Sequence, residues 1–236
     1  MKSNNVSKMI LLFSILIQFA FIQFNNFFTL ELPYITGLTG EASLGESLEM
    51  IFLMTIPIPF FLWVCSGEIS NILYGNGKVY IIRKAKRSRM FMKITANVIK
   101  EAVLMAVITY ILFTVFCKED YEPVGVVTRL EIILIYYMVL CNMALFMYLL
   151  ELFQKEQIAH MIATVYFVLS LFIYPYSIKH IPEPLCQVVL FPNLMFTGRN
   201  GIIEHDMFPV SFMMAAGIGV ILEIIIVRVL NKKDIL

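Results

Sequence analysis

The chain has 236 residues, of which 60% are hydrophobic and only 15% are charged. Soluble domains are about half apolar and a quarter charged, so this composition excludes an ordinary water-soluble fold. The net charge of +1 gives no indication of a nucleic-acid partner, and none is expected. A mean hydropathy of +0.83 instead predicts an all-α integral membrane protein whose single transmembrane domain spans residues 1–236.

Six apolar stretches come close to the roughly 20 residues that cross a bilayer. They cover residues 9–28, 48–66, 94–116, 130–150, 160–178 and 209–230. Lys2 and Lys8 precede the first stretch as in a signal peptide, but no small-residue cleavage site follows and the apolar run continues to Phe28. We therefore expect a retained first span and six transmembrane helices in all.

The basic residues predict the orientation of these spans, because cytoplasmic loops are enriched in Lys and Arg. A cytoplasmic N-terminus leaves only Lys118, Arg129, Lys179 and Arg199 of the 18 basic residues outside. The outer loops at 31–49 and 119–122 are then acidic. Both termini are accordingly expected in the cytoplasm, and the protein is expected to be a multi-pass membrane protein.

The inner loop at 67–93 is the most informative segment of the chain. Ile69, Ile72 and Leu73 follow helical spacing, which predicts a short amphipathic helix at the membrane surface. A glycine turn at 75–77 follows, then an apolar patch at 79–82 and a basic stretch at 83–93. Basic residues beside a span also fix topology and bind anionic lipid, at about 1 kcal/mol each. That alternative does not explain the order of these four features.

A second short segment precedes the last span, at 181–196. Its apolar part, 188–196, is too short to span, and prolines interrupt the segment. Such a segment either re-enters the membrane from outside or lies on the bilayer surface.

The two segments together resemble those of membrane subunits of type-2 ATP-binding-cassette exporters, in particular the short permeases of Gram-positive bacteria. The closest likeness is Tyr80–Arg83 and Arg87–Arg89 followed by Lys93, within the stretch from Glu68 to Lys93. The resemblance extends to six spans with both ends inside and to short re-entrant helices before the last span. It implies that 67–93 is the coupling segment, which rests in a groove of the ATPase subunit. The residues implied in docking are Glu68, Ile69, Ile72, Leu73, Tyr80, Arg83, Arg87, Arg89 and Lys93.

The resemblance implies a permease subunit that exports a hydrophobic or amphipathic peptide, such as an antimicrobial or signalling peptide. Two cytoplasmic ATP-binding subunits and a second permease subunit, identical or homologous, would complete the transporter. This sequence contains no GxxxxGK[ST] motif, so ATP and Mg are expected on the partner ATPase and no cofactor on this chain. We therefore expect a transport subunit, not an enzyme.

Polar residues inside spans are candidates for a transport path, because they are costly in lipid. These are Gln18, Asn25, Asn142 and Glu223. The alternative, which we favour for any single residue, is a hydrogen bond between helices worth roughly 1 kcal/mol or less. No catalytic residue is expected, and the three dispersed histidines predict no metal site. A disulfide between Cys117 and Cys186 stays open, since both are expected near the outer face.

Readings from other classes remain. A substrate-binding subunit of a vitamin importer is also small and six-spanning, but it would not need the long basic inner loop. An intramembrane enzyme would require a cluster of ionisable residues that the sequence does not show. A non-transporting immunity or sensor protein would lack an associated ATPase.

Overall fold

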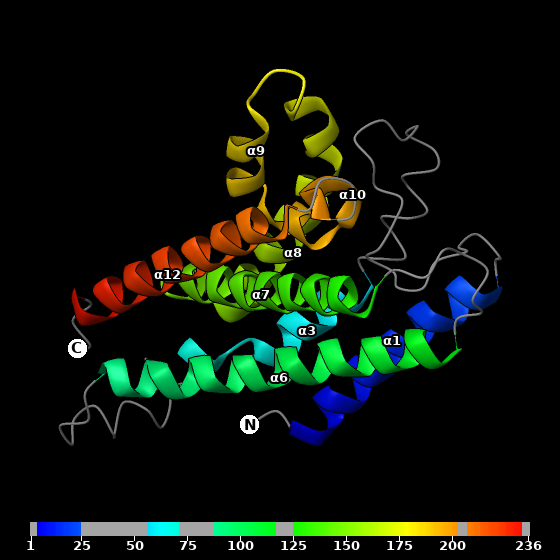
Figure 1. Cartoon of the computed structure of the whole chain (residues 1–236). Helices are drawn as coiled ribbons and strands as arrows, with labels where there is room; N and C mark the ends of the chain where they lie inside the picture. Colours follow the sequence, from blue (N-terminus) through cyan, green and yellow to red (C-terminus); the bar gives the residue numbers. More distant parts are fainter. Residues whose placement is uncertain (1–3, 25–55, 71–86, 117–124, 203–206, 233–236) are drawn as a thin grey trace.

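The computed structural model describes residues 4–24, 56–70, 87–116, 125–202 and 207–232. Every regular element within these ranges is helical, which confirms the all-α prediction (Figure 1). The principal helices are α1 (Asn4–Phe24), α3 (Pro57–Cys65), α6 (Arg87–Phe116), α7 (Val126–Glu151), α8 (Glu156–Ser177) and α12 (Phe208–Lys232). Shorter helices, α9 (Glu183–Val189), η1 (Phe191–Met195) and α10 (Thr197–Asn200), lie between α8 and α12.

Four of the helices in the described ranges are long and apolar enough to cross a membrane, as expected of an integral membrane protein. They are α7, α8, α12 and the stretch Phe91–Ile111 of α6. Helix α1 contributes a shorter apolar stretch, Leu11–Ala20, and α3 has 9 residues. The second predicted span began at residue 48, but residues 48–55 lie outside the described ranges. Within those ranges α3 begins at Pro57, where a proline loses no helical hydrogen bond.

Helix α7 forms the centre of the bundle. In its apolar stretch 61% of the residues are buried, against 33% in α6 and α8 and 22% in α12. It contacts α12 most extensively and also packs against α6, α8 and η1. A helix that is apolar on all sides suits this central place, because it meets protein in every direction.

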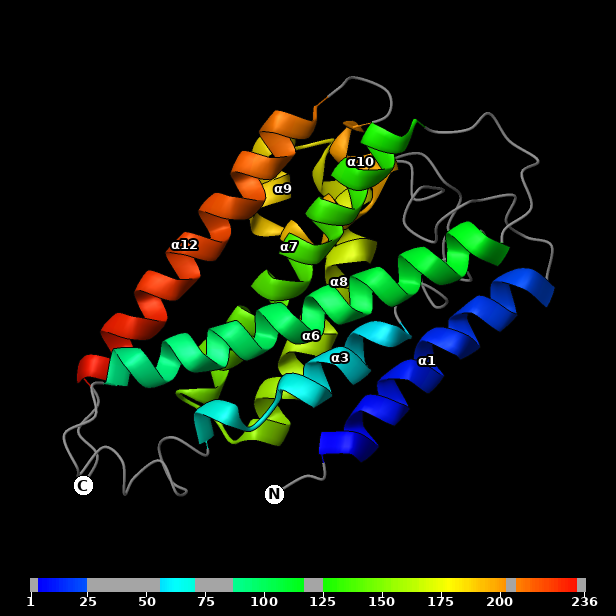
Figure 2. The ribbon, with the colours of Figure 1, turned by 60° about the horizontal axis from the view of Figure 1, so that its bottom comes forward.

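The long helices alternate in direction along the chain (Figure 2). We call the end at which α3, α7 and α12 finish and α6 and α8 begin the basal end. Helix α1 also begins towards the basal end, and α9 and α10 lie towards the opposite, distal end (Figure 2). This up-and-down arrangement brings the loop after α3 and the start of α8 to the same end of the molecule.

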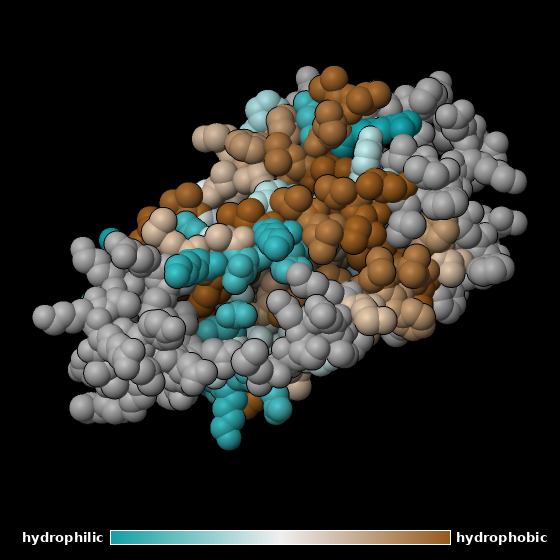
Figure 3. All heavy atoms as spheres, turned by 90° about the horizontal axis from the view of Figure 1, so that it is seen from below, coloured by the Kyte–Doolittle hydropathy of each residue, from teal (hydrophilic) through white to brown (hydrophobic). Residues whose placement is uncertain are grey.

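The outward faces of the long helices are apolar. Exposed side chains include Val103 and Val107 on α6, Val165 on α8 and Val220 on α12. Figure 3 shows such a surface from below, where apolar side chains form a broad area with a group of hydrophilic side chains beside it. An apolar exterior of this extent is that of a protein whose solvent is lipid.

The short helices at the distal end pack onto α7 and α8. Tyr166 of α8 donates a hydrogen bond from its hydroxyl to the backbone oxygen of Val189, at 2.7 Å. The rings of Phe146, Tyr166 and Phe191 contact one another in tilted and edge-on orientations, with centroids 4.9–6.4 Å apart. The predicted segment at 181–196 is thus two short helical pieces, of which Phe191–Phe196 are buried.

Candidate functional site

The first residues of the predicted coupling segment are held at the basal end of α7. Gly67 follows α3 with a φ of +88°, a left-handed conformation that glycine adopts without strain. The backbone N–H of Gly67 donates to Oε1 of Glu151, at 2.8 Å. Residues 68–70 then resume a helical conformation. Glu151 is the last residue of α7 and only 2% exposed, so a buried carboxylate fixes the start of the loop.

One turn earlier on α7, a second hydrogen bond holds the same segment. The hydroxyl of Tyr148 donates to the backbone oxygen of Cys65, at 3.1 Å. Ile69, just beyond Gly67, is fully buried in the core. We call Cys65, Gly67, Tyr148 and Glu151 the loop anchor. A hydrogen bond to a charged group contributes about 1.5–3 kcal/mol and one between neutral groups about 0.5–1.5 kcal/mol, so the two bonds of the loop anchor together link α3 to α7.

Helix α8 closes against the loop anchor from the other side. A Cβ atom at position 67 would lie 2.5 Å from Oε2 of Glu156, which is in the first turn of α8. The end of the flexible Glu156 side chain would have to move to admit a side chain at this position. Glycine is therefore favoured first for its backbone conformation and second for the space that it leaves beside Glu156.

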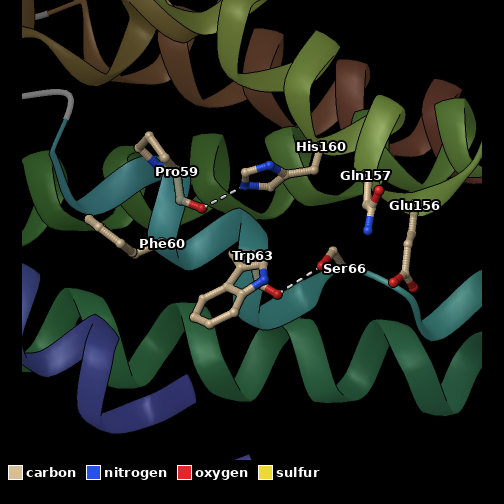
Figure 4. Close-up of a pocket in the computed structure, with 7 residues that line it drawn as sticks. All are labelled: Pro59, Phe60, Trp63, Ser66, Glu156, Gln157 and His160. Atoms are coloured by element: carbon tan, nitrogen blue, oxygen red, sulfur yellow. Dashed lines mark hydrogen bonds between the residues drawn. The ribbon is translucent and has the colours of Figure 1, made fainter. Parts of the chain in front are cut away.

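A cleft lies beside the loop anchor, between α3 and α8 (Figure 4). Its volume is about 480 Å³, within the range of small-molecule sites. Helix α3 and its C-cap contribute Pro59, Phe60, Trp63 and Ser66, and α8 contributes Glu156, Gln157 and His160. We call this space the α3–α8 cleft.

One hydrogen bond ties the two walls of the α3–α8 cleft together. Nε2 of His160 lies 2.9 Å from the backbone oxygen of Pro59, and since a carbonyl oxygen only accepts, the imidazole is the donor (Figure 4). The hydroxyl of Ser66 donates to the backbone oxygen of Trp63, at 2.9 Å. Both walls are thereby fixed without a ligand.

The structure places only part of the predicted docking set. Glu68 and Ile69 directly follow the loop anchor, and Lys93 is exposed on α6. The backbone of Arg87 and Arg89 lies in the first turn of α6. Ile72, Leu73, Tyr80 and Arg83 lie outside the described ranges. The described members therefore flank the basal end, and their contact with an ATPase stays a prediction.

Asn142, a predicted path residue, joins two helices. Its side-chain nitrogen donates to the backbone oxygen of Ala215 on α12, at 2.8 Å, and the residue is 3% exposed. A Cβ at Gly219 would lie 2.7 Å from Oδ1 of Asn142, so glycine allows α12 to approach. This geometry matches the alternative reading, a hydrogen bond between helices.

The other predicted path residues lie on different helices. Gln18 is buried on α1. Glu223 is half-buried on α12 and, with Arg228, lines a groove of about 590 Å³ against α6. Asn25 lies outside the described ranges. A transport path through these residues stays a prediction.

A polar cluster at the distal end was not recognised from sequence. Arg199 of α10 is 3% exposed and donates to the backbone oxygen of Leu171, at 3.0 Å, and to Oδ1 of Asn193. Its guanidinium lies 5.0 Å from the ring centre of Tyr174. Burial lowers the pKa of Arg199 to about 10. The only sequence signal was a basic residue left on the outer side.

The cysteine pair considered from the sequence falls only partly within the described ranges. Cys186 is a buried, free cysteine, and Cys117 lies outside the described ranges. No group of three His, Cys, Asp or Glu residues within those ranges is arranged to hold a metal ion.

Comparisons with known proteins assign no chemistry to this site. A family model described as "Protein of unknown function (DUF2705)" matches residues 11–236. The uncharacterized protein YybK of Bacillus subtilis (strain 168) is 23% identical over 214 residues, which cover 86% of this chain and 85% of that protein. No solved structure matches the chain. The function must therefore be inferred from the residues of this chain.

Proposed function

Since the chain belongs to the DUF2705 family, whose description names no activity, we propose from its own residues that it is the permease subunit of an ATP-driven exporter. The observation that carries this proposal is the loop anchor. It joins the start of the basic loop to the most buried helix of the bundle through the Gly67–Glu151 hydrogen bond.

The proposed topology has six spans, with both termini and the basal end in the cytoplasm. Four long apolar helices support it, as does the alternation of these helices with α1 and α3. The basal end also carries Lys93, Lys155 and Arg228, consistent with the enrichment of cytoplasmic loops in basic residues. A bacterial plasma membrane is the proposed location.

The proposed mechanism follows from the contacts of α7. Two ATPase subunits beneath a pair of permease subunits would bind the 67–93 segments and move them when ATP closes the ATPases. The loop anchor passes this movement to α7, and α7 packs against α6, α8 and α12. Because packed interfaces shift between discrete arrangements, a small displacement at Gly67 can rock the whole bundle. ATP and Mg act on the partner chains only.

The proposed cargo is a hydrophobic or amphipathic peptide, leaving the cell or the membrane. The apolar exterior supports entry of such a peptide from the bilayer. The α3–α8 cleft, which lies beside the start of the loop, supplies a largely apolar site for it. Antimicrobial and signalling peptides are the cargo class that the exporter resemblance favours.

Co-purification tests this proposal. The chain is expressed with its chromosomal neighbours, purified through a tag on this subunit, and assayed for bound ATPase. Wild type is expected to retain an ATP-binding subunit, and Arg83→Glu/Arg87→Glu is expected to lose it or its coupling by charge reversal in the loop. Lys179→Glu, exposed beyond the distal end of α8, is the control and should retain it.

Absence of any ATPase from the wild-type preparation would overturn the proposal in favour of an immunity or sensor protein. Tight binding of one small molecule by the isolated chain, with an ATPase that ignores the loop mutations, would instead indicate a vitamin-importer subunit.

A further inference from the structure

The α3–α8 cleft has the chemistry of a site for an organic cation. Two of its lining side chains, Phe60 and Trp63, are aromatic, and both come from α3. Aromatic faces attract ammonium and related cations within about 6 Å, and tryptophan attracts them most strongly. The rings also supply apolar area for the uncharged body of a ligand.

The described lining of the cleft carries negative charge. Among the described residues that line it, Glu156 is the only acidic one and none is Lys or Arg. Glu156 is half-buried, so its carboxylate is partly shielded from solvent. A carboxylate in a partly apolar setting favours a cation and disfavours an anion, because Coulomb interactions strengthen as water is excluded.

Two of the three remaining polar side chains already hold hydrogen bonds, and the third, Gln157, is exposed. His160 donates to the backbone oxygen of Pro59, and Ser66 donates to the backbone oxygen of Trp63. The ligand therefore needs no dense hydrogen-bonding surface, which suits a quaternary ammonium, a phosphonium or an alkylammonium group on an apolar body. The walls of the cleft are already held in place, so binding loses less entropy through ordering of the protein.

We propose that the α3–α8 cleft binds the cationic group of an amphipathic molecule, with Glu156 as the counter-charge and Trp63 as the aromatic face. The proposal rests on the proposed function and extends it by naming the chemical class of the cargo. The cleft lies at the basal end, so the ligand enters where lipid meets the cytoplasm if that topology holds. Trp63 suits such a boundary, where tryptophan is enriched.

Trp63 also reports on its own site, because it is the single tryptophan of the chain. The purified full-length subunit, without an ATPase, is titrated with tetraphenylphosphonium while Trp63 fluorescence is recorded. Saturable quenching is expected. Glu156→Gln should weaken binding about tenfold by removing the counter-charge while keeping the side-chain volume.

Two controls separate binding in the cleft from partitioning into detergent. Glu131→Gln changes a carboxylate near the start of α7, at the distal end, and should leave the affinity unchanged. Triphenylphosphine oxide, a neutral aromatic of similar size, should bind at least about tenfold more weakly than the cation. Equal affinity of Glu156→Gln and wild type, or of the neutral compound and the cation, would overturn the proposal.

The source of the cation is decided by a second titration. A lysine-containing amphipathic peptide and its acetylated, uncharged counterpart compete with tetraphenylphosphonium for wild type. Competition by the charged peptide alone identifies a peptide amine as an occupant, and competition by neither restricts the cleft to small organic cations.

Because binding is measured on the isolated subunit, its failure is distinct from failure of the exporter assignment. If the isolated subunit binds the cation through Glu156 but no ATPase co-purifies with the chain, the cleft is a cation site and the exporter assignment is wrong. If an ATPase co-purifies but the cation does not bind, the exporter assignment stands and the cation site is wrong.

Discussion

The carboxylate of Glu151, at the end of α7, accepts a hydrogen bond from the backbone N–H of Gly67, 84 positions earlier in the chain. This contact fixes the first residue of the basic loop to the helix with the most buried apolar stretch. A loop attached to the bundle only through α3 could move with a bound partner without displacing the other helices. The observed link predicts that the start of the loop moves together with α7.

Gly67→Ala should distort the loop anchor. An alanine at a φ of +88° is strained by about 1–2 kcal/mol, and its Cβ would meet the carboxylate of Glu156. We expect the unfolding temperature in detergent to fall by a few degrees. Gly125→Ala is the control, because that glycine has a φ of −53° and its Cβ would meet only ordinary contact, 3.8 Å from Oγ1 of Thr128. Equal stability of Gly67→Ala and wild type would show that this backbone conformation is not required.

The α7–α12 contact predicts coupling between Asn142 and Gly219. Asn142→Ala should cost about 1 kcal/mol by removing the hydrogen bond to Ala215. Gly219→Ala should destabilise wild type because its Cβ would press on Oδ1 of Asn142, yet it should be neutral or stabilising beside Asn142→Ala.

Thermal unfolding of the four proteins of this double-mutant cycle measures the coupling. Gly217→Ala, two residues away with open space around its Cβ, serves as the control and should stabilise slightly. Additive effects of Asn142→Ala and Gly219→Ala would refute the proposed close approach.

Arg199→Gln should loosen the distal cluster. The substitution removes the hydrogen bond to Leu171 and the interaction with Tyr174, for a net loss of about 1.5–3 kcal/mol. Limited proteolysis of the segment between α8 and α12 should accelerate, whereas exposed Arg228→Gln should have no effect there. Unchanged proteolysis would show that Arg199 does not order the segment.

The pH dependence of this effect has a defined sign. Burial lowers the pKa of Arg199 in the folded protein to about 10, below its value in the unfolded chain, so the unfolded chain binds more protons between the two pKa values. Its contribution to stability therefore rises with pH above about 10 and falls back as pH drops through that value. Between pH 6 and 9, the difference in unfolding temperature between Arg199→Gln and wild type should stay constant.

Hydropathy was sufficient to predict the helical class and the approximate positions of the long helices. The stretches at 94–116, 130–150 and 209–230 each fall inside a helix of the structure, and 160–178 lies in α8 up to Ser177, because spans must satisfy their backbone hydrogen bonds internally. The prediction was weaker at the site. Glu151, directly after the predicted stretch 130–150, received no role, since its partner is a backbone N–H whose position no side-chain pattern reveals.

Polarity inside a span identified candidate residues but not their roles. Asn142 and Glu223 are alike in being polar groups among apolar neighbours, yet one bridges two helices and the other lines a groove. The difference depends on which face of a helix meets a neighbour, and that is decided by packing. The α3–α8 cleft was missed for the same reason, because Trp63 and His160 are 97 positions apart and only packing joins them.

Movement of α7 on ATP binding tests directly whether the loop anchor couples an ATPase to the bundle. Spin labels are placed at exposed Gln154 and Lys232, in a background with the four native cysteines replaced by alanine. Their separation is measured by pulsed electron paramagnetic resonance in the complex, before and after trapping with ATP and vanadate. Glu131→Ala, which removes a carboxylate near the start of α7, is the control.

We predict that trapping changes the separation in wild type and in Glu131→Ala, while Glu151→Ala still binds the ATPase but shows no change. The same change in Glu151→Ala as in wild type would contradict the claim that the hydrogen bond to Gly67 transmits the movement.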